Sequence, residues 1–303
     1  MFYTIKDKIN RRIFAAKCGG ILDTAPLVSW PESNLTVISQ LQHKDLLMYL
    51  LAVKSFTRHI GVKDIHVLDD GSLDAEDIAV LRHHIPFLNL RSIADFRNPH
   101  CPQGGTWERL IAISELVKKS YVIQLDSDTL TVGGIDEVAR CVADGIGFSI
   151  GTWDNQQSEK MQERCATAKS LKPGLDTHVQ LVAEANFDKL SDYENLNYIR
   201  GCSGFAGFPQ GSFSIDFMEK ISQEMQAAIG DKWAAWGSEQ VMSNIVVANI
   251  ASAVVLPHPK YCASNKLKEG AGTAFIHFIG SHRFNDGIYA GMGMAIIDEL
   301  CES

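Results

Sequence analysis

The sequence predicts an α/β fold built on a mostly parallel sheet, and three observations support this prediction. Short apolar or β-branched runs alternate with amphipathic helical patterns over the first two-thirds of the 303-residue chain. The run Tyr121–Leu125 is apolar apart from Gln124, which is typical of a strand buried at the centre of a sheet. Hydrophobic residues make up 46% and charged residues 21% of the chain, the composition of a globular protein with a large core.

The elements are expected to alternate along the chain. Each strand is a short run bounded by turn residues, β-branched at Leu35–Leu41 and apolar at Tyr121–Leu125, and each helix repeats apolar residues on one face. The polar stretch Asp154–Leu196 interrupts this rhythm and is expected to form loops and short helices on the substrate side. Strands are expected at Leu35–Leu41, Ile65–Leu68, Leu88–Ala94 and Tyr121–Leu125, and helices at Asp45–His59, after the cap Asp74, and at Thr106–Lys119, Ser214–Ile229 and Ser238–Ile250.

The charge and the cysteines argue against several classes of function. Because 28 Lys and Arg stand against 36 Asp and Glu, the formal net charge is −8, and no basic block offers a footprint for nucleic acid. The seven cysteines are scattered without a C-x-x-C pair, which argues against a disulfide framework and against a zinc knuckle. A reducing, cytoplasmic compartment is the simplest interpretation.

The N-terminal segment has two interpretations. No stretch approaches the ~18 consecutive apolar residues that span a bilayer. No cleavable signal is expected, because no apolar run follows the first basic residues. Residues 2–14 do form an amphipathic helical pattern, which fits a helix packed on its own domain, or alternatively a weak contact with a membrane surface. The pattern sets Phe2, Ile5, Ile9 and Ile13 beside Lys6, Lys8, Arg11 and Arg12.

The pattern most informative about function is Asp126-Ser127-Asp128, directly after the buried strand. Ligands of open α/β sheets bind beyond the carboxyl ends of the strands. Two carboxylates this close repel each other unless a cation lies between them, and a hard divalent metal that also bridges a diphosphate meets that need. The alternative is a strand-end turn in which Asp126 caps the next segment and Asp128 is solvated.

The stretch around this turn, WERLIAISELVKKSYVIQLDSDTLTVGGIDEV, resembles the core of GT-A glycosyltransferases, and of glycosyltransferase family 8 in particular. Arg109-Leu110 matches the family's helix motif, and Asp126 with Asp128 matches its Asp-x-Asp. Three further segments follow in the order of the family's F-N-x-G, Asp-Gln and H-x-x-G-x-x-K motifs: Cys202-Ser203-Gly204-Phe205, Glu239-Gln240, and the run from His277 through Gly280, Ser281 and His282 to Arg283.

Some positions depart from the family pattern. The Asn of F-N-x-G is replaced by Cys202 or Ser203, the Asp of Asp-Gln by Glu239, and the final Lys by Arg283. The turn Asp69–Ser72 is more similar to the uracil-binding strand end of glycosyltransferase family 2.

The resemblance implies a GT-A fold with helices on both faces of the central sheet. Residues 1–33 would be an N-terminal extension, 34–150 the half that binds the nucleotide-sugar, and 151–303 the acceptor-side half with a tail that binds metal and diphosphate. It also implies a metal-dependent transferase that moves a hexose from a UDP-sugar to a carbohydrate, lipid-linked or protein acceptor, with retention of configuration.

Three residues are expected to hold the metal, namely Asp126, Asp128 and His277. Two carboxylates and one imidazole suit Mn²⁺, with Mg²⁺ as the second choice. The metal would stabilise charge on the departing diphosphate. His277 taken alone would be a core histidine, because its neighbours Ile276 and Phe278 are apolar.

The other expected site residues contact the donor. Arg283 would bind the leaving diphosphate through charge-assisted hydrogen bonds, and Gly280 would let the backbone approach it. Glu239 and Gln240 would face the sugar, although Ser238 as a helix N-cap would leave Glu239 only a favourable charge at a helix end. The remaining donor contacts are expected from Ser39, Gln40, Asp69, Asp70, Arg109, Asp126 and Ser127.

Two other functions stay open on the sequence alone. A sugar-phosphate nucleotidyltransferase would need a Gly-rich loop after the first strand, and the segment 40–44 has no glycine. A non-catalytic carbohydrate-binding relative would tolerate the loss of Asp126 or Asp128, and both are present. Trp153, Trp233 and Trp236 are candidates either for an acceptor platform or for half-buried packing.

Overall fold

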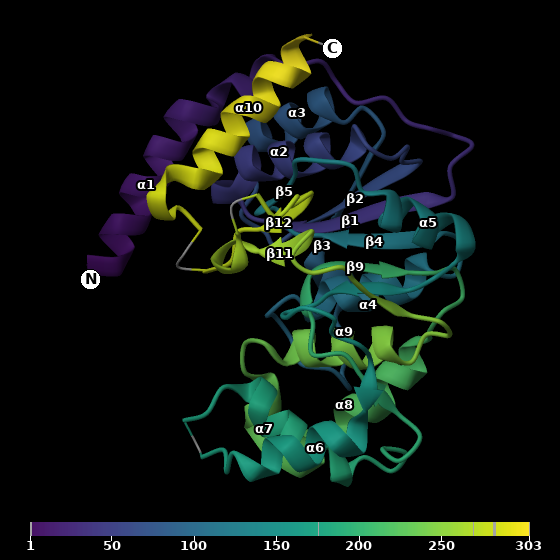
Figure 1. Ribbon diagram of the computed structural model, residues 1–303. Helices are drawn as coiled ribbons and strands as arrows, with labels where there is room; N and C mark the ends of the chain where they lie inside the picture. The colour runs from purple at the N-terminus through teal and green to yellow at the C-terminus, as the bar shows by residue number, and fades with distance from the viewer. Residues whose placement is uncertain (1, 175, 269, 281–282, 303) are drawn as a thin grey trace. The chain divides into compact units, whose positions relative to one another are not determined.

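The computed structural model describes residues 2–174, 176–268, 270–280 and 283–302. Its strands form a seven-stranded, a three-stranded and a two-stranded sheet, and helices flank them (Figure 1). The predicted α/β architecture is therefore confirmed. The chain divides into two compact units, the first made of Met1–Arg91, Leu125–Asp136 and Pro259–Ser303, the second of Ser92–Gln124 and Glu137–His258.

The first unit holds the strand order β1-β2-β3 of the large sheet and the whole three-stranded sheet. β1 and β2 pair in parallel, with Leu41 opposite Asp69 at their carboxyl ends. In the small sheet β12 is parallel to β11 and antiparallel to β5. The elements are α1 (Phe2–Cys18), β1 (Leu35–Leu41), α2 (Leu46–Thr57), β2 (Asp64–Asp69), α3 (Ala75–His84), β3 (Leu88–Ser92), β5 (Thr129–Thr131), β11 (Tyr261–Ala263), β12 (Phe275–His277) and α10 (Ile288–Glu302).

The second unit holds the strand order β10-β6-β9-β4, in which β6 is parallel to β10 and antiparallel to β9. The stretch predicted as loops and short helices forms α6 and α7, as well as one strand of the two-stranded sheet. The elements are α4 (Trp107–Leu116), β4 (Tyr121–Leu125), α5 (Asp136–Asp144), β6 (Phe148–Ile150), β7 (Glu159–Lys160), α6 (Met161–Ser170), α7 (Val179–Ala185), β8 (Asn197–Tyr198), β9 (Cys202–Phe208), α8 (Ile215–Ile229), α9 (Ser238–Ala248) and β10 (Val254–Leu256).

Most predicted elements are confirmed to within a few residues, and β1 and β4 have the predicted bounds. α3 follows the predicted cap, because the Asp74 carboxylate accepts hydrogen bonds from two amides of the first turn in a capping box. The predicted strand Leu88–Ala94 is too long. β3 ends at Ser92, whose hydroxyl accepts a hydrogen bond from the Ala94 amide and caps a short 3-10 helix.

The structure decides between two pairs of alternatives near α9. Gly237, at φ 99°, is the N-cap of α9, and Ser238 is the first helical residue. The Ser238 hydroxyl accepts a hydrogen bond from the Trp107 indole nitrogen at 2.8 Å, so it does not cap the helix. Trp233 is fully buried, with its ring 5.6 Å from that of Trp107, and this removes it from the candidates for an acceptor platform. Trp236, in contrast, is 79% exposed.

None of the described helices is long and apolar enough to cross a membrane. The cysteines are all free thiols, and most of them are buried.

Candidate active site

The turn Asp126–Asp128 is fixed by hydrogen bonds at both of its ends. Before the turn, the Ser39 hydroxyl donates to the Leu125 carbonyl at 2.6 Å. After it, the Thr129 hydroxyl donates to the Asp126 carbonyl at 2.8 Å. The chain then enters β5, which pairs antiparallel with β12 and sets Thr129 opposite His277. This pairing of strands far apart in sequence brings His277 to the turn.

Three side chains converge at this point. His277 Nε2 lies 3.2 Å from Asp128 Oδ1 and 3.6 Å from Asp126 Oδ2. Asp128 and His277 are buried, and Asp126 is half-buried. One ligand atom from each residue lies within 4.8 Å of the others. Two carboxylate oxygens and an imidazole nitrogen at this spacing fit a divalent metal ion, and the burial of Asp128 argues against a solvated turn.

Arg283 neutralises part of the negative charge at the cluster. Its Nη2 donates to Asp128 Oδ2 at 2.6 Å, and its Nη1 lies 3.9 Å from Asp45 Oδ1. Burial on its own raises the pKa of Asp128. The opposing effect of His277 and Arg283 is larger, and the resulting pKa is about 2. Burial lowers the pKa of Arg283, while Asp128 and Asp45 raise it above its ordinary value. Both groups are therefore ionised at neutral pH.

Phe278 and Arg283 are held beside the turn by hydrogen bonds. The Phe278 amide donates to the Asp128 carbonyl at 2.8 Å, and the Arg283 Nε donates to the Phe278 carbonyl at 3.2 Å. Gly280 has φ 51°, a backbone conformation that favours glycine, and a Cβ there would meet no atom within 4 Å. Ser281 and His282 of the predicted motif lie outside the described residues.

An aromatic stack supports the turn from the C-terminal helix. Tyr289 of α10 stacks on Phe278 with ring centroids 4.1 Å apart, and its hydroxyl donates to the Ser127 carbonyl at 3.5 Å. A pocket opens beside Phe278 and Arg283. It is lined by Ser264, Asn265, Leu267, Phe278, Arg283, Asn285, Asp286 and Ile288.

The side chains at the ends of β1 and β2 differ in how many hydrogen bonds they make within the protein. Ser39 is fully buried and its hydroxyl is bound to the strand end. Asp69 accepts hydrogen bonds from the amides of Gly71 and Leu73, and Asp70 accepts from the Ser72 amide and hydroxyl, so both organise the turn. Gln40 is half-buried, and its side-chain oxygen has no hydrogen-bond partner among the described residues.

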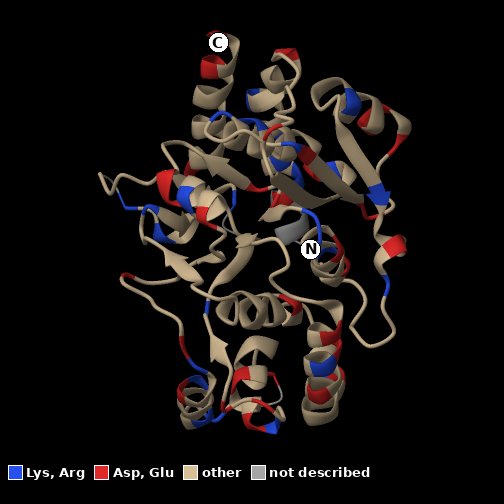
Figure 2. Ribbon diagram, turned by 90° about the vertical axis from the view of Figure 1, so that its right-hand side faces the viewer, with Lys and Arg blue, Asp and Glu red and all other residues tan. Residues whose placement is uncertain are grey.

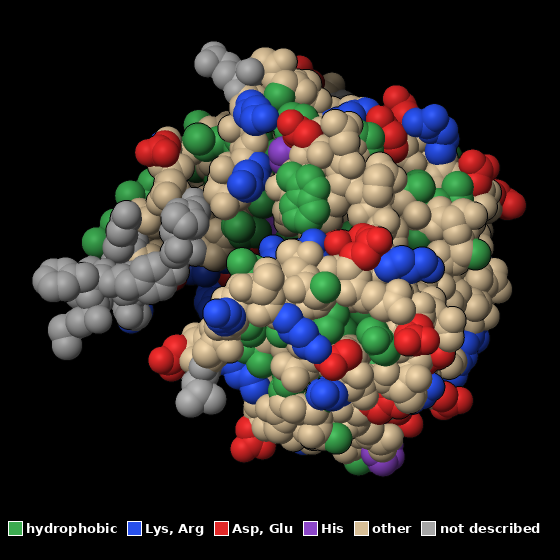
Figure 3. Space-filling view, turned by 60° about the horizontal axis from the view of Figure 1, so that its bottom comes forward, with side chains coloured by type: hydrophobic (Ala, Val, Ile, Leu, Met, Phe, Trp, Pro, Cys, Tyr) green, Lys and Arg blue, Asp and Glu red, His purple; other side chains and the backbone are tan. Residues whose placement is uncertain are grey.

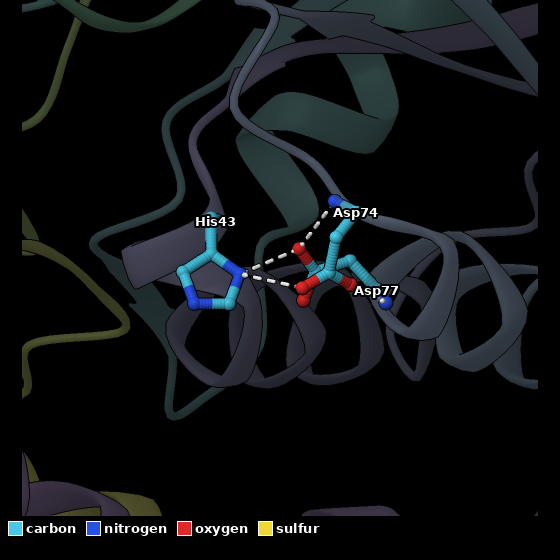
Figure 4. A group of neighbouring side chains, drawn as sticks. All are labelled: His43, Asp74 and Asp77. Atoms are coloured by element: carbon cyan, nitrogen blue, oxygen red, sulfur yellow. Dashed lines mark hydrogen bonds and ion pairs between the residues drawn. The ribbon is translucent and has the colours of Figure 1, made fainter.

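A second group of metal-ligand residue types lies near the same strand ends (Figure 4). His43 Nδ1 lies 2.6 Å from Asp77 Oδ2 and 3.8 Å from Asp74 Oδ2. Asp77 Oδ2 also accepts a hydrogen bond from the Asp74 amide as part of the capping box of α3. His43 and Asp74 are exposed, so this group has the partners and the exposure of a helix cap.

Glu239 is buried in the second unit among hydrogen-bond donors. Its Oε2 accepts from the Thr106 hydroxyl at 3.0 Å and from the Ser203 hydroxyl at 3.2 Å. Arg109 Nη2 lies 4.0 Å from Glu239 Oε1, and both side chains are almost fully buried. The predicted residues Arg109 and Glu239 are thus brought together, and the carboxylate is balanced by one cation and two hydroxyls.

The neighbouring Gln240 continues this polar network. Its side-chain oxygen accepts from the Ser203 amide at 3.4 Å, and its amide nitrogen donates to Gln180 Oε1 at 3.4 Å. Thr106 precedes α4 with φ 74°, a strained conformation for a β-branched residue. Strained backbone conformations cluster at functional sites. Here the strained residue is the one whose hydroxyl contacts Glu239.

Sequence reasoning missed three of these residues. Asp45 follows β1 as an ordinary turn residue, and its pairing with Arg283 spans most of the chain. Thr106 precedes a glycine-flanked helix start, where Gly104-Gly105 is the available signal of unusual backbone. Ser264 lines the pocket beside Arg283, and its buried hydroxyl has no partner in the part of the chain that the structure describes.

Charge of both signs is spread over the helices (Figure 2). Acidic, basic and hydrophobic side chains are also interspersed on the face shown in Figure 3. Because the chain carries a formal net charge of −8, a phosphate group must be met by local cations such as Arg283.

No protein-family model matches the chain, and no curated protein matches it. Similar folds are found among solved structures. The apo structure of the bifunctional glycosyltransferase WbbM superposes with a TM-score of 0.53 at 13% identity, over 91% of this chain and 53% of that one. This chain therefore spans about half of the length of that protein.

Two further solved structures are more distant in fold. The galactosyltransferase LgtC, in complex with donor and acceptor sugar analogues, has a TM-score of 0.45 at 12% identity, over 87% of this chain and 95% of that one. The glycosyltransferase GlyE of Streptococcus pneumoniae has a TM-score of 0.47 at 12% identity, over 89% of this chain and 64% of that one. The likeness to WbbM shows the fold, and the predicted GT-A glycosyltransferase fold is confirmed.

Proposed function

We propose that this chain, which has the GT-A fold, is a metal-dependent glycosyltransferase that moves a hexose from a UDP-sugar to an acceptor with retention of configuration. The convergence of Asp126, Asp128 and His277 after β4 is the observation that supports this most strongly. The donor set suits Mn²⁺, with Mg²⁺ as the second choice. A bound divalent ion supplies Lewis-acid stabilisation of charge on the leaving diphosphate.

Arg283 is proposed to bind the diphosphate. Its guanidinium is cationic at neutral pH, lies beside the acidic turn and lines a pocket together with Ser264 and Asn265. A guanidinium binds phosphate oxygens through paired charge-assisted hydrogen bonds, and the Ser264 hydroxyl would add a neutral donor. Gly280 would leave room for the phosphates beside the backbone, because a Cβ there would point into open space.

Gln40 is proposed as a contact of the nucleoside, because its buried side-chain oxygen needs a donor. Uracil and ribose both present donors of that kind. Asp69 and Asp70 would contribute through whichever carboxylate oxygens the turn does not use. Roles in donor binding for Ser39, Ser127, Arg109 and the Asp126 carboxylate remain predictions.

Glu239 and Gln240 are proposed to face the transferred sugar. The two hydroxyls and the Arg109 guanidinium around Glu239 are donors, so they favour the ionised carboxylate. An ionised carboxylate next to an oxocarbenium-like centre stabilises its positive charge. The acceptor is proposed to be a carbohydrate, a lipid-linked molecule or a protein, and a cytoplasmic location also stays a prediction.

A donor screen tests the activity directly. Release of UDP or GDP is measured from UDP-glucose, UDP-galactose, UDP-N-acetylglucosamine and GDP-mannose, each with Mn²⁺, with Mg²⁺ and with EDTA. Turnover of one UDP-sugar with Mn²⁺ that stops with EDTA is the expected result. Turnover of GDP-mannose alone would overturn the UDP assignment, and release that EDTA does not change would overturn the metal site.

The same preparation separates the alternatives. Asp128→Asn removes a proposed metal ligand, whereas Asp77→Asn changes an aspartate of the helix cap and serves as the matched control. A nucleotidyltransferase would instead release diphosphate from UTP in the presence of a sugar phosphate. A proton NMR time course of the newly formed anomeric signal decides between retention and inversion.

A further inference from the structure

The N-terminal helix α1 is fixed to the protein by one face. Phe14 is buried, with its ring centroid 4.6 Å from that of Tyr289 on α10. Cys18 is also buried against α10, with its sulfur 3.7 Å from the Ala290 carbonyl oxygen. The inner face of α1 therefore has a partner, and the helix is held in place as an element of the first unit.

The opposite face of α1 is exposed and apolar along its centre. Ile9 is 52% and Ile13 is 49% exposed, one helical turn apart. Lys8 and Arg12 are exposed along one side of this pair, and Lys17 is exposed on the other side, as the helical repeat places them. An apolar stripe flanked by cationic side chains is typical of helices that lie in a membrane interface.

The net charge of α1 is positive, whereas the net charge of the whole chain is negative. Segment 2–18 contains five basic residues and one acidic residue, although the chain as a whole has a formal net charge of −8. The single acid, Asp7, pairs with Arg11 at 2.8 Å, and Arg11 also pairs with Asp45 at 2.7 Å. The only acidic residue of α1 is therefore engaged by Arg11. The exposed cations of the helix are Lys8, Arg12 and Lys17 among the side chains that the structure describes.

The neighbouring helix α10 also exposes apolar side chains. α10 packs beside α1 (Figure 1). It exposes Ile288 and Met294 in its first half. Its second half exposes the acidic residue Asp298, which marks the end of the apolar part. The outer face of α1, with its exposed isoleucines and cations, is therefore the region suited to a partner that is both apolar and anionic.

We propose that this outer face of α1 binds the surface of an anionic membrane. The isoleucines would enter the boundary between headgroups and acyl chains, and Lys8, Arg12 and Lys17 would lie near the lipid phosphates. A second copy of this chain is a poorer partner, because a symmetric contact through this face would bring like charges together. Phe2, Ile5 and Lys6 of the predicted pattern have side chains outside the described part.

This proposal rests on the composition and exposure of α1 and not on the proposed transfer reaction. One short helix gives weak, reversible attachment, so binding should depend strongly on ionic strength and on the fraction of anionic lipid. If the chain transfers sugars, attachment at a membrane favours a lipid-linked acceptor over a free carbohydrate.

Co-sedimentation with vesicles tests the proposal. The full chain is mixed with vesicles of 70% phosphatidylcholine and 30% phosphatidylglycerol, or of phosphatidylcholine alone, at low and at high salt. The variants are Ile9→Ser with Ile13→Ser, Lys8→Glu with Arg12→Glu, and Val28→Ser as the control. Val28 is 78% exposed and lies outside α1, so it controls for the loss of an exposed apolar side chain.

The wild type and Val28→Ser should sediment with the anionic vesicles at low salt, and both double variants should bind at least about tenfold more weakly, because one loses two apolar side chains and the other reverses two charges at the membrane surface. Circular dichroism and metal-dependent UDP binding check that the variants are folded. Equal binding to neutral vesicles, or unchanged binding of both double variants, would overturn the proposal. Light scattering would overturn the proposal in favour of a second copy if the wild type is a dimer and the Ile9→Ser with Ile13→Ser variant is a monomer.

Discussion

Among the residues that the structure describes, the first unit contains two groups of one histidine and two aspartates. The two groups differ in which neighbouring groups neutralise or bind their carboxylates. In the group formed by Asp126, Asp128 and His277, two members are buried and Arg283 supplies the compensating charge. In the group formed by His43, Asp74 and Asp77, the aspartates are engaged by the amides at the start of α3.

The difference shows why residue type and proximity do not define a metal site. Asp77 has a complete structural explanation, because its carboxylate serves the capping box and pairs with the exposed His43. Asp128 takes part in no capping box that the structure describes, and its burial with a histidine and an arginine costs desolvation energy that no structural role of its carboxylate explains. A substitution of Asp128 should therefore lower activity, whereas a substitution of Asp77 should lower stability and leave activity intact.

The largest expected effect is that of Asp128→Asn on activity. Loss of one carboxylate weakens metal binding and leaves Arg283 without its closest anion, so donor turnover should fall at least about a thousandfold. The measurement is UDP release at saturating donor, with circular dichroism to show that the variant is folded. The matched Asp77→Asn should retain activity within about twofold at 25 °C. Equal losses in the two variants would contradict the distinction between the groups.

Arg283→Lys should give an intermediate effect. Lysine keeps the positive charge but cannot make two parallel hydrogen bonds to a phosphate, so we expect a loss of about tenfold to a hundredfold in kcat/KM. Arg283→Met should lose more, because it also removes the charge beside Asp128. The measurement is the dependence of the rate on donor concentration. A lysine variant as active as the wild type would show that Arg283 acts only as a charge, or that it does not contact the donor.

Asp77→Ala should change stability and leave turnover intact. It removes half of the capping box of α3 and the partner of His43, so the free energy of unfolding should fall by about 1–2 kcal/mol. Urea denaturation followed by circular dichroism measures this. The control is Glu76→Ala, on the exposed side of the same turn, which should change stability less. An unchanged unfolding midpoint together with lost activity would show that this group acts in the active site and not as a helix cap.

The smallest effect concerns pH. The hydrogen bond to Asp77, followed by the charge of Asp77, raises the pKa of His43 above its ordinary value. The protonated ring is therefore favoured in the folded state, and its stabilisation is complete below the unfolded pKa and disappears as the pH rises through the folded pKa. Because the ring is largely exposed, the gain is small. The difference in melting temperature between the wild type and His43→Ala should shrink from pH 5.5 to pH 8.5, and a constant difference would contradict the ion pair.

The strands and helices near the site could be predicted because their signals are local. β1 is a short β-branched run and β4 a short, mostly apolar run, both are followed by polar residues, and the helix after Asp74 begins with a recognisable cap. The end of β3 was predicted too late, since a single hydroxyl, that of Ser92, decides where the strand stops. Such a hydrogen bond leaves no periodic pattern in the sequence.

The site itself was predictable only in part. Asp126 and Asp128 follow a buried strand, and this local pattern identifies them. That His277 lies beside them depends on the pairing of β5 with β12, which no local pattern shows and which only the resemblance to a family suggested. Asp45 and Thr106 were missed for the same reason, because their contacts join residues that are distant in sequence. Ser264 was missed because a residue that lines a pocket leaves no pattern in the sequence.

The most direct test of the metal site is a calorimetric titration of UDP into the protein, with Mn²⁺ and then with EDTA. We expect chelation, and equally His277→Ala, to weaken UDP binding about tenfold to a hundredfold, while His43→Ala binds UDP as the wild type does. UDP binding that is the same with EDTA, or the same in His277→Ala, would contradict the assignment of Asp126, Asp128 and His277 as the ligands of a catalytic metal.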